Sequence, residues 1–122
     1  FFADPSAEHL AVFVRICMPL YNRTPQDTSL QRHSIRTPAV IEHFRRGELL
    51  SFDLLPHLRD VRCPVMLYGG EDDPMTPIAD QEDIFAALPP GGVTFHRIPS
   101  AGHGPYRDDP RVLDLIREFI VA

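Results

Sequence analysis

The chain has 122 residues, of which 43% are hydrophobic, and a formal net charge of −5. This predicts one modest domain, and the absence of an 18-residue apolar run excludes a membrane-spanning helix. The basic residues are all arginine and form no concentrated cluster, which argues against a nucleic-acid partner. We expect a soluble, cytoplasmic protein, and the absence of lysine indicates a GC-rich bacterial genome. Cys17 and Cys63 lack a metal-site or disulfide pattern and are expected to be buried free thiols.

The first half of the chain predicts two helices and a polar connection. Residues 4–21 begin with a capping sequence and place apolar residues at helical spacing, with Pro19 ending or bending the helix. Residues 22–36 are polar and without a period, which predicts a loop. Residues 37–47 start with Thr-Pro and end at a glycine, so they predict a second helix. The leucine-rich residues 48–60 are expected to lead the chain into the core.

An unbroken apolar run at 65–68 is followed by two glycines and three acids, Glu71, Asp72 and Asp73. The run predicts a central parallel strand that is buried on both faces, and the glycines predict a tight turn after it. Ligands of open parallel sheets bind at the carboxyl ends of the strands. The acids therefore stand where a functional site is expected. A metal site is not expected at these acids, because hard cations need six or more oxygens at spaced positions.

A second strand is predicted at 93–98, after a helix that starts at Thr76 and Pro77. Strand, helix and strand form a right-handed unit with parallel strands, so both following loops emerge at one sheet edge. The second of these loops carries His103 between two glycines. Because neighbouring strands lie about 4.8 Å apart, an acid of the first loop and His103 come within hydrogen-bonding reach. Both Asp72 and Asp73 satisfy this argument.

The combined pattern resembles the C-terminal part of the α/β-hydrolases. The motifs are a strand with Gly70-x-x-Asp73-x-x-x-Pro77, then a helix, a strand, Gly102-His103, and a closing helix after Pro110 with an apolar stripe of Val112, Leu113, Ile116, Phe119 and Ile120. The spacing to Pro77 has the form found in that family and favours Asp73 over Asp72. The resemblance implies an α/β fold, with parallel strands and flanking helices at 51–122 and a helical cap remnant at 1–50.

The resemblance is closest to the proline iminopeptidase-like enzymes, which act on N-terminal residues or on amino-acid amides and esters. It implies that Asp73 orients His103, which serves as general base in a triad. No Gly-x-Ser-x-Gly motif occurs in the sequence. The nucleophile is therefore expected in an upstream segment of the same protein, with this chain inert alone. Phe1 is expected to be neither a natural start nor part of a signal peptide.

Three further residues are candidates for substrate binding. Met75 and Tyr106 each stand beside a motif residue and either line a pocket or pack locally. Acids of the cap hold the substrate amine in the resembled enzymes, which makes Glu42 a candidate, with a solvated helix glutamate as the alternative. We expect a small-molecule or peptide substrate and no cofactor. An epoxide hydrolase or dehalogenase with an aspartate nucleophile, and a binding module without catalysis, remain as alternatives.

Overall fold

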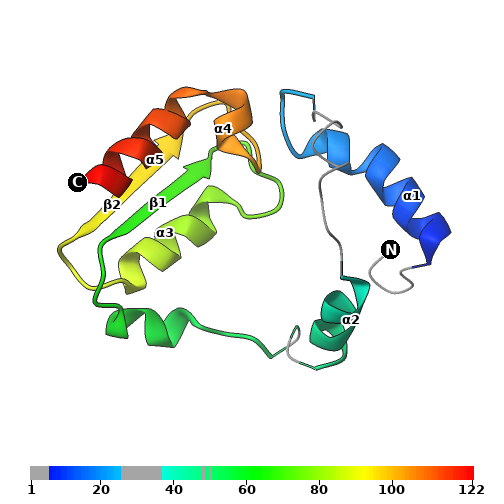
Figure 1. Ribbon diagram of the computed structural model, residues 1–122, viewed down its shortest axis with the longest axis horizontal. Helices are drawn as coiled ribbons and strands as arrows, with labels where there is room; N and C mark the ends of the chain where they lie inside the picture. The colour runs from blue at the N-terminus through cyan, green and yellow to red at the C-terminus, as the bar shows by residue number, and fades with distance from the viewer. Residues whose placement is uncertain (1–5, 26–36, 48, 50) are drawn as a thin grey trace.

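The computed structural model describes residues 6–25, 37–47, 49 and 51–122 (Figure 1). Its helices and strands follow one another in this order: α1 (Ala7–Ile16), the 3-10 helix η1 (Met18–Leu20), α2 (Pro38–Arg46), the 3-10 helix η4 (Leu55–Asp60), β1 (Val65–Gly70), α3 (Ile78–Ala87), β2 (Val93–Ile98), α4 (Pro105–Asp108) and α5 (Arg111–Val121). Within these residues, no helix has the length and apolar character needed to cross a membrane.

The two strands form a parallel sheet joined by α3, as the sequence predicted. Their register runs from Val65 opposite Val93 to Gly70 opposite Ile98. Both strands therefore end at the same edge, and the loops that carry Asp73 and His103 leave side by side. The second strand has the predicted bounds, and the first continues through the glycines to Gly70.

Helices cover the two faces of this sheet. Side chains alternate between faces along a strand, and Phe95 meets Phe85 of α3 on one face, with ring centroids 5.6 Å apart. Ile98, on the opposite face, belongs to a small core with Ala101 and with Val112 of α5. Figure 1 shows α3 and α5 flanking the strand pair. The result is a three-layer arrangement, with parallel strands between helices.

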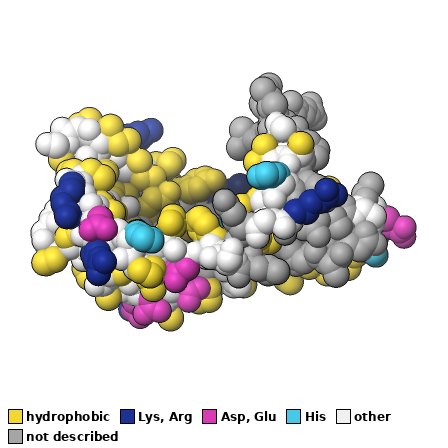
Figure 2. Space-filling view, turned by 90° about the horizontal axis from the view of Figure 1, so that it is seen from below, with side chains coloured by type: hydrophobic (Ala, Val, Ile, Leu, Met, Phe, Trp, Pro, Cys, Tyr) yellow, Lys and Arg dark blue, Asp and Glu magenta, His cyan; other side chains and the backbone are white. Residues whose placement is uncertain are grey.

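Several predictions of burial are wrong. The residues of β1 from Val65 to Tyr68 are only half-buried, because β2 is the only strand paired with β1 among the described residues. In α5 the residues packed on the core are Val112, Leu115 and Ile116, whereas Leu113 and Ile120 are exposed. Figure 2 shows exposed hydrophobic side chains gathered on the half of the molecule that carries the sheet.

The helices of the first half have the predicted bounds to within a turn. Ser6 caps α1 by accepting a hydrogen bond from the backbone of His9, and α2 begins after Thr37. The first helix ends before Pro19, which lies in η1. Figure 1 shows α1 and α2 standing apart from the sheet, on the side away from α5.

The leucine-rich segment after α2 does not bury its side chains as expected. Its helical part η4 lies against α3, yet Leu54 and Leu55 are 54% and 41% exposed. Both cysteines are free thiols, as predicted, but neither is buried: Cys17 is partly accessible and Cys63 is exposed.

Candidate functional site

Asp73 lies in the turn between β1 and α3, where three hydrogen bonds fix its carboxylate. Its Oδ1 accepts from the backbone N–H of Met75 at 2.7 Å and of Thr76 at 3.1 Å. Its Oδ2 accepts from the Thr76 hydroxyl at 2.7 Å. The sequence predicted that the helix starts at Thr76. In the structure α3 begins after Pro77, and the threonine hydroxyl binds the carboxylate of Asp73 instead. The turn immobilises Asp73 without help from other parts of the chain.

The carboxylate is buried but remains an anion. Asp73 is 8% exposed, and this burial by itself raises its pKa. The hydrogen bonds from Thr76, from the Met75 backbone and from His103 together outweigh burial, so the pKa is lowered overall. An ionised carboxylate accepts hydrogen bonds only. The ring nitrogen that faces Asp73 must then carry its proton and donate.

His103 meets this carboxylate from the loop after β2. Its Nδ1 lies 3.1 Å from Oδ2 of Asp73, so the predicted approach of these side chains is observed. The imidazole is 44% exposed, in contrast to the buried carboxylate. Within the described part of the chain, its Nε2 has no hydrogen-bond partner. One ring nitrogen is thus held by an anion while the other is left open.

Asp72, the alternative acid, has a different partner. Its Oδ2 accepts hydrogen bonds from Nε and Nη2 of Arg23, at 3.1 and 2.5 Å. Both side chains of this ion pair are about half exposed, at 63% for Arg23 and 48% for Asp72. The geometry therefore separates the two acids: Asp73 binds the imidazole, and Asp72 binds an arginine at the surface.

The glycines of both loops allow backbones to approach closely. A Cβ at Gly70 would lie 2.2 Å from the carbonyl oxygen of Ala101, and the backbone N–H of Asp72 donates to that oxygen at 2.9 Å. A Cβ at Gly102 would lie 2.0 Å from the carbonyl oxygen of Tyr21. Carbon–oxygen contacts normally need about 3.3 Å. Backbones therefore crowd one another at both positions, which leaves room only for glycine.

Residues 21–24, here called the strap, were predicted only as the end of a helix and the start of a loop. The backbone N–H of His103 donates to the carbonyl of Tyr21 at 2.6 Å. The Tyr21 ring also lies edge-on to the imidazole, with centroids 5.6 Å apart, and Phe13 of α1 lies edge-on to Tyr21 at 6.1 Å. The strap therefore connects α1 directly to the histidine.

Asp108 holds the strap against the histidine loop. Its Oδ2 accepts from the backbone N–H of Gly102 at 2.8 Å, and its Oδ1 from the N–H of Thr24 at 2.7 Å. The N–H of Arg23 and the side-chain amide of Asn22 add contacts to Oδ2, each at 3.3 Å. Burial raises the pKa of Asp108, but these hydrogen bonds outweigh it and hold the pKa well below its usual range.

Asp108 precedes the pair Asp109-Pro110, from which the sequence predicts the start of the last helix. Pro110 is the cap residue of α5, and Asp109 accepts a hydrogen bond from the N–H of Arg111 at 3.0 Å. The adjacent carboxylate was left without a role. Its partners in the strap are 84 to 86 residues away in the chain, so spacing alone does not reveal them.

The remaining candidates lie around this edge or outside what can be described. Met75 is 43% exposed and contributes its N–H to Asp73. Tyr106 is 40% exposed, with the guanidinium of Arg107 5.7 Å from its ring centroid. Glu42 belongs to α2, but its side chain lies outside the described residues. Whether any of the three binds substrate stays a prediction.

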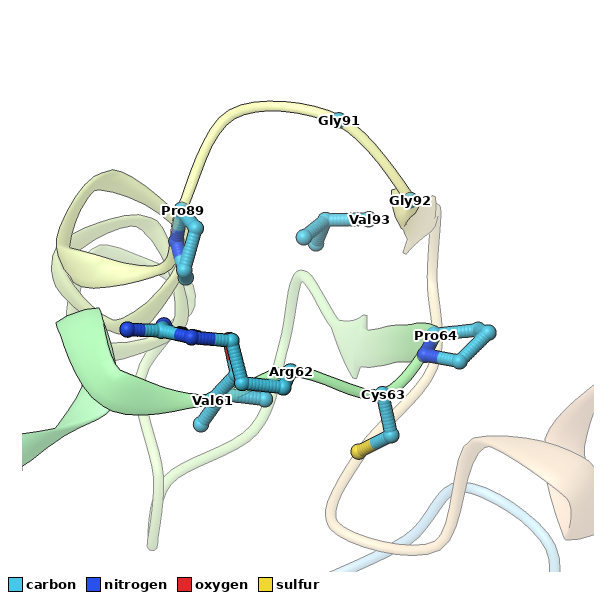
Figure 3. A pocket seen from close by; sticks show the side chains of 8 residues that line it. All are labelled: Val61, Arg62, Cys63, Pro64, Pro89, Gly91, Gly92 and Val93. Carbon is cyan, nitrogen blue, oxygen red and sulfur yellow. Dashed lines mark hydrogen bonds between the residues drawn. The ribbon is translucent and has the colours of Figure 1, made fainter.

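A pocket of about 240 Å³ lies at the opposite end of the sheet. It is lined by Val61, Arg62, Cys63, Pro64, Pro89, Gly91, Gly92 and Val93 (Figure 3). These residues precede the two strands, whereas ligands of parallel sheets bind beyond the carboxyl ends. Asp73 and His103, beyond the carboxyl ends of the strands, are therefore the candidate functional site. Among the residues that the structure describes, no group of three His, Cys, Asp or Glu side chains is placed to hold a metal ion.

No protein-family model and no curated protein sequence matches the chain. Solved structures do match its fold. A thermophilic esterase from Thermogutta terrifontis, with malate bound, superposes with a TM-score of 0.63 and 23% identity, over 93% of this chain and 44% of the esterase. MGS-M2, an α/β-hydrolase enzyme from a Medee basin deep-sea metagenome library, superposes with a TM-score of 0.61 and 19% identity, over 92% of this chain and 45% of that enzyme. The chain thus has the fold of part of an α/β-hydrolase and spans less than half the length of these two neighbours.

Proposed function

We propose that this chain supplies the acid and the base of a serine-hydrolase triad, with Asp73 as the acid and His103 as the general base. One observation carries the proposal. A buried, ionised carboxylate that is fixed by three local hydrogen bonds lies 3.1 Å from Nδ1 of an imidazole that is itself 44% exposed. A nucleophilic serine and the oxyanion-hole donors would come from an upstream segment of the same protein.

The proposed mechanism follows from the protonation states. Because Asp73 is ionised, the proton of the neutral imidazole lies on Nδ1, which leaves the Nε2 lone pair free to accept a proton. Nε2 takes the proton of the serine hydroxyl as the oxygen attacks the substrate carbonyl, and returns it to the leaving group. In the second half-reaction, Nε2 activates a water molecule that hydrolyses the acyl-enzyme. Asp73 stabilises the imidazolium formed in each step.

The proposed substrates are carboxylic esters and amides. The likeness to a protein described as an esterase supports esters. We further propose amino-acid esters, amides and short peptides with a free amine, as in the proline iminopeptidase-like enzymes. Residues 1–50 would then form a cap over the core at 51–122, with Glu42 facing the amine. The position of α1 and α2 apart from the sheet supports a separate cap (Figure 1), and the two free thiols support a reducing, cytoplasmic location.

A fluorophosphonate probe tests the proposal on the full-length protein, alongside turnover of p-nitrophenyl esters and amino-acid p-nitroanilides. We expect one labelled serine, located by mass spectrometry upstream of Phe1. His103→Ala is expected to abolish both labelling and turnover, since it removes the base. His57→Ala is the matched control, because His57 is exposed in η4, away from the Asp73 carboxylate. That variant should behave as the wild type.

Three results would contradict the proposal. A label on residues 1–122 would place the nucleophile on this chain. Trapping of substrate on an upstream aspartate, with turnover of epoxides or haloalkanes, would identify the alternative hydrolase class. A protein that binds ligands but shows neither label nor turnover would be a binding module.

A further inference from the structure

Asp108 is unusual among the carboxylates of this chain because its partners come from separate parts of the fold. It lies at the end of α4, and its oxygens collect four N–H donors, three from the strap and one from Gly102. Asp73 and Asp109 take their donors mainly from their own turn or helix start, and Asp72 takes both of its donors from one side chain, that of Arg23. Asp108 therefore joins the strap to the loop that carries His103.

The donors stand directly beside the histidine. Gly102, whose N–H binds Asp108, precedes His103 in the chain, and the next N–H, that of His103, donates to the Tyr21 carbonyl of the strap. The Cα of Asn22 would lie 2.9 Å from a Cβ at Gly102, so the strap and the loop are packed without a gap. A shift of the strap must consequently shift the backbone that carries the imidazole.

We propose that Asp108 is a positioning residue that clamps the strap, residues 21–24, onto the Gly102–His103 backbone and so holds the imidazole in line with Asp73. The inference rests on the proposed function of His103 as general base. It adds a residue that touches neither substrate nor nucleophile and acts only through the histidine loop. It also links the cap side of the molecule to the base, because the strap continues from α1 and η1.

A carboxylate is required for this role. Thr24 donates to Oδ1, and Gly102, Arg23 and Asn22 donate to Oδ2, so both oxygens act only as acceptors. In an asparagine side chain, an NH2 group replaces one of the oxygens. In either orientation this group would point at a donor, either at Thr24 or at the three others. Asp108→Asn therefore loses at least the Thr24 contact and weakens the clamp, while it preserves the size of the side chain.

Asp109→Asn is the matched control. Asp109 is the next residue along the chain and loses the same charge, but its oxygens bind the backbone and guanidinium of Arg111 at the start of α5. Among the described residues, its carboxylate makes no hydrogen bond with the strap or with the histidine loop. An effect common to both variants would reflect lost charge or a weakened α5, whereas an effect of Asp108→Asn alone reflects the clamp.

The test uses the full-length protein, with kcat and KM for a p-nitrophenyl ester and the proton NMR resonance of the imidazole Nδ1–H. For Asp108→Asn we expect kcat to fall about 10- to 100-fold, because misplacing a catalytic group by about 1 Å costs up to about 10²-fold. KM should stay within about threefold. The Nδ1–H resonance should broaden or shift. Asp109→Asn should leave kcat within about twofold and the resonance unchanged.

Three results for Asp108→Asn would contradict the inference. An unchanged kcat in Asp108→Asn, a loss confined to KM, or a loss of kcat with an unaltered Nδ1–H resonance would overturn the inference. If Asp108→Asn does not fold, Asn22→Ala decides, because it removes a single weaker contact to Asp108. It should lower kcat about twofold to tenfold and perturb the same resonance, and wild-type values would refute the clamp. The resonance also separates this inference from the proposed function: if His103→Ala keeps its activity while Asp108→Asn still alters the resonance, the clamp stands and the catalytic assignment fails.

Discussion

Gly102→Ala is the substitution whose effect follows most directly from the geometry. The added Cβ would lie 2.0 Å from the Tyr21 carbonyl oxygen and 2.9 Å from the Cα of Asn22, and both are backbone atoms. A carbon–oxygen contact needs about 3.3 Å, so the Tyr21 carbonyl must retreat by about 1.3 Å. The hydrogen bond from the His103 N–H to that carbonyl, 2.6 Å long in the wild type, does not survive such a shift.

The cost has two parts. The lost backbone hydrogen bond contributes about 1 kcal/mol, and forcing an additional carbon into a packed contact contributes about 1–3 kcal/mol. We therefore expect the free energy of unfolding to fall by about 2–4 kcal/mol. Because the strap moves away from His103, we also expect kcat to fall about 10²-fold.

Urea unfolding and ester hydrolysis of the full-length protein measure both effects. Gly104→Ala is the control from the same loop. Its Cβ would meet side-chain atoms of Asn22 and Arg107 at 3.3–3.5 Å, and flexible side chains give way at little cost. It should change stability by less than about 1 kcal/mol. Gly102→Ala with the stability and kcat of Gly104→Ala would refute the described contact between strap and loop.

Three further predictions concern packing, backbone conformation and pH. Val112 is 1% exposed, and Val112→Ala should lower the free energy of unfolding by about 2 kcal/mol. Val121 is 83% exposed, and Val121→Ala should change the free energy of unfolding by less than about 0.5 kcal/mol. Urea unfolding measures both effects. Gly92→Ala should lower the thermal midpoint of unfolding although the added Cβ would meet no atom within 4 Å, because the φ of 74° at this position costs residues other than glycine about 1 kcal/mol. An unchanged midpoint would contradict that backbone conformation. The pKa values of Asp73 and Asp108 are lower in the folded state, so the stability that these carboxylates contribute is present above the ordinary pKa near 3.8 and is lost as the pH falls below it. Urea unfolding at decreasing pH should show this loss of stability. The loss should be smaller in Asp108→Asn.

The pairing of Asp73 with His103 was predictable because it follows from local rules. An apolar run before two glycines, a helix of ordinary length and a second strand define a parallel unit, and the handedness of its crossover fixes where both loops emerge. The turn around Asp73 is also local, since its three fixing donors lie within three residues. The choice of Asp73 over Asp72 depended on the spacing to Pro77, and the structure separates the two acids by the ion pair of Asp72 with Arg23.

The strap and Asp108 were not predictable, for a physical reason. Two of their contacts join residues 84 and 85 positions apart through backbone N–H groups, which every residue type except proline carries, and the third uses the side-chain amide of Asn22, 86 positions away. No side-chain pattern therefore marks the donors, and Asp108 looks like a second capping carboxylate. The burial of β1 was overestimated for a related reason, because the unbroken apolar run is typical of a central strand while the described residues pair it on one edge only.

The measurement that tests the central claim most directly compares Asp73→Asn with Asp72→Asn in the full-length protein, by steady-state hydrolysis of a p-nitrophenyl ester. The first substitution keeps the size of the side chain but removes the anion that holds His103, and we expect kcat to fall about 10⁴-fold. The second removes an exposed ion pair, and we expect kcat within about threefold of the wild type. If Asp73→Asn retains most of its activity, or if Asp72→Asn loses as much, the carboxylate of Asp73 is not the partner of a catalytic base.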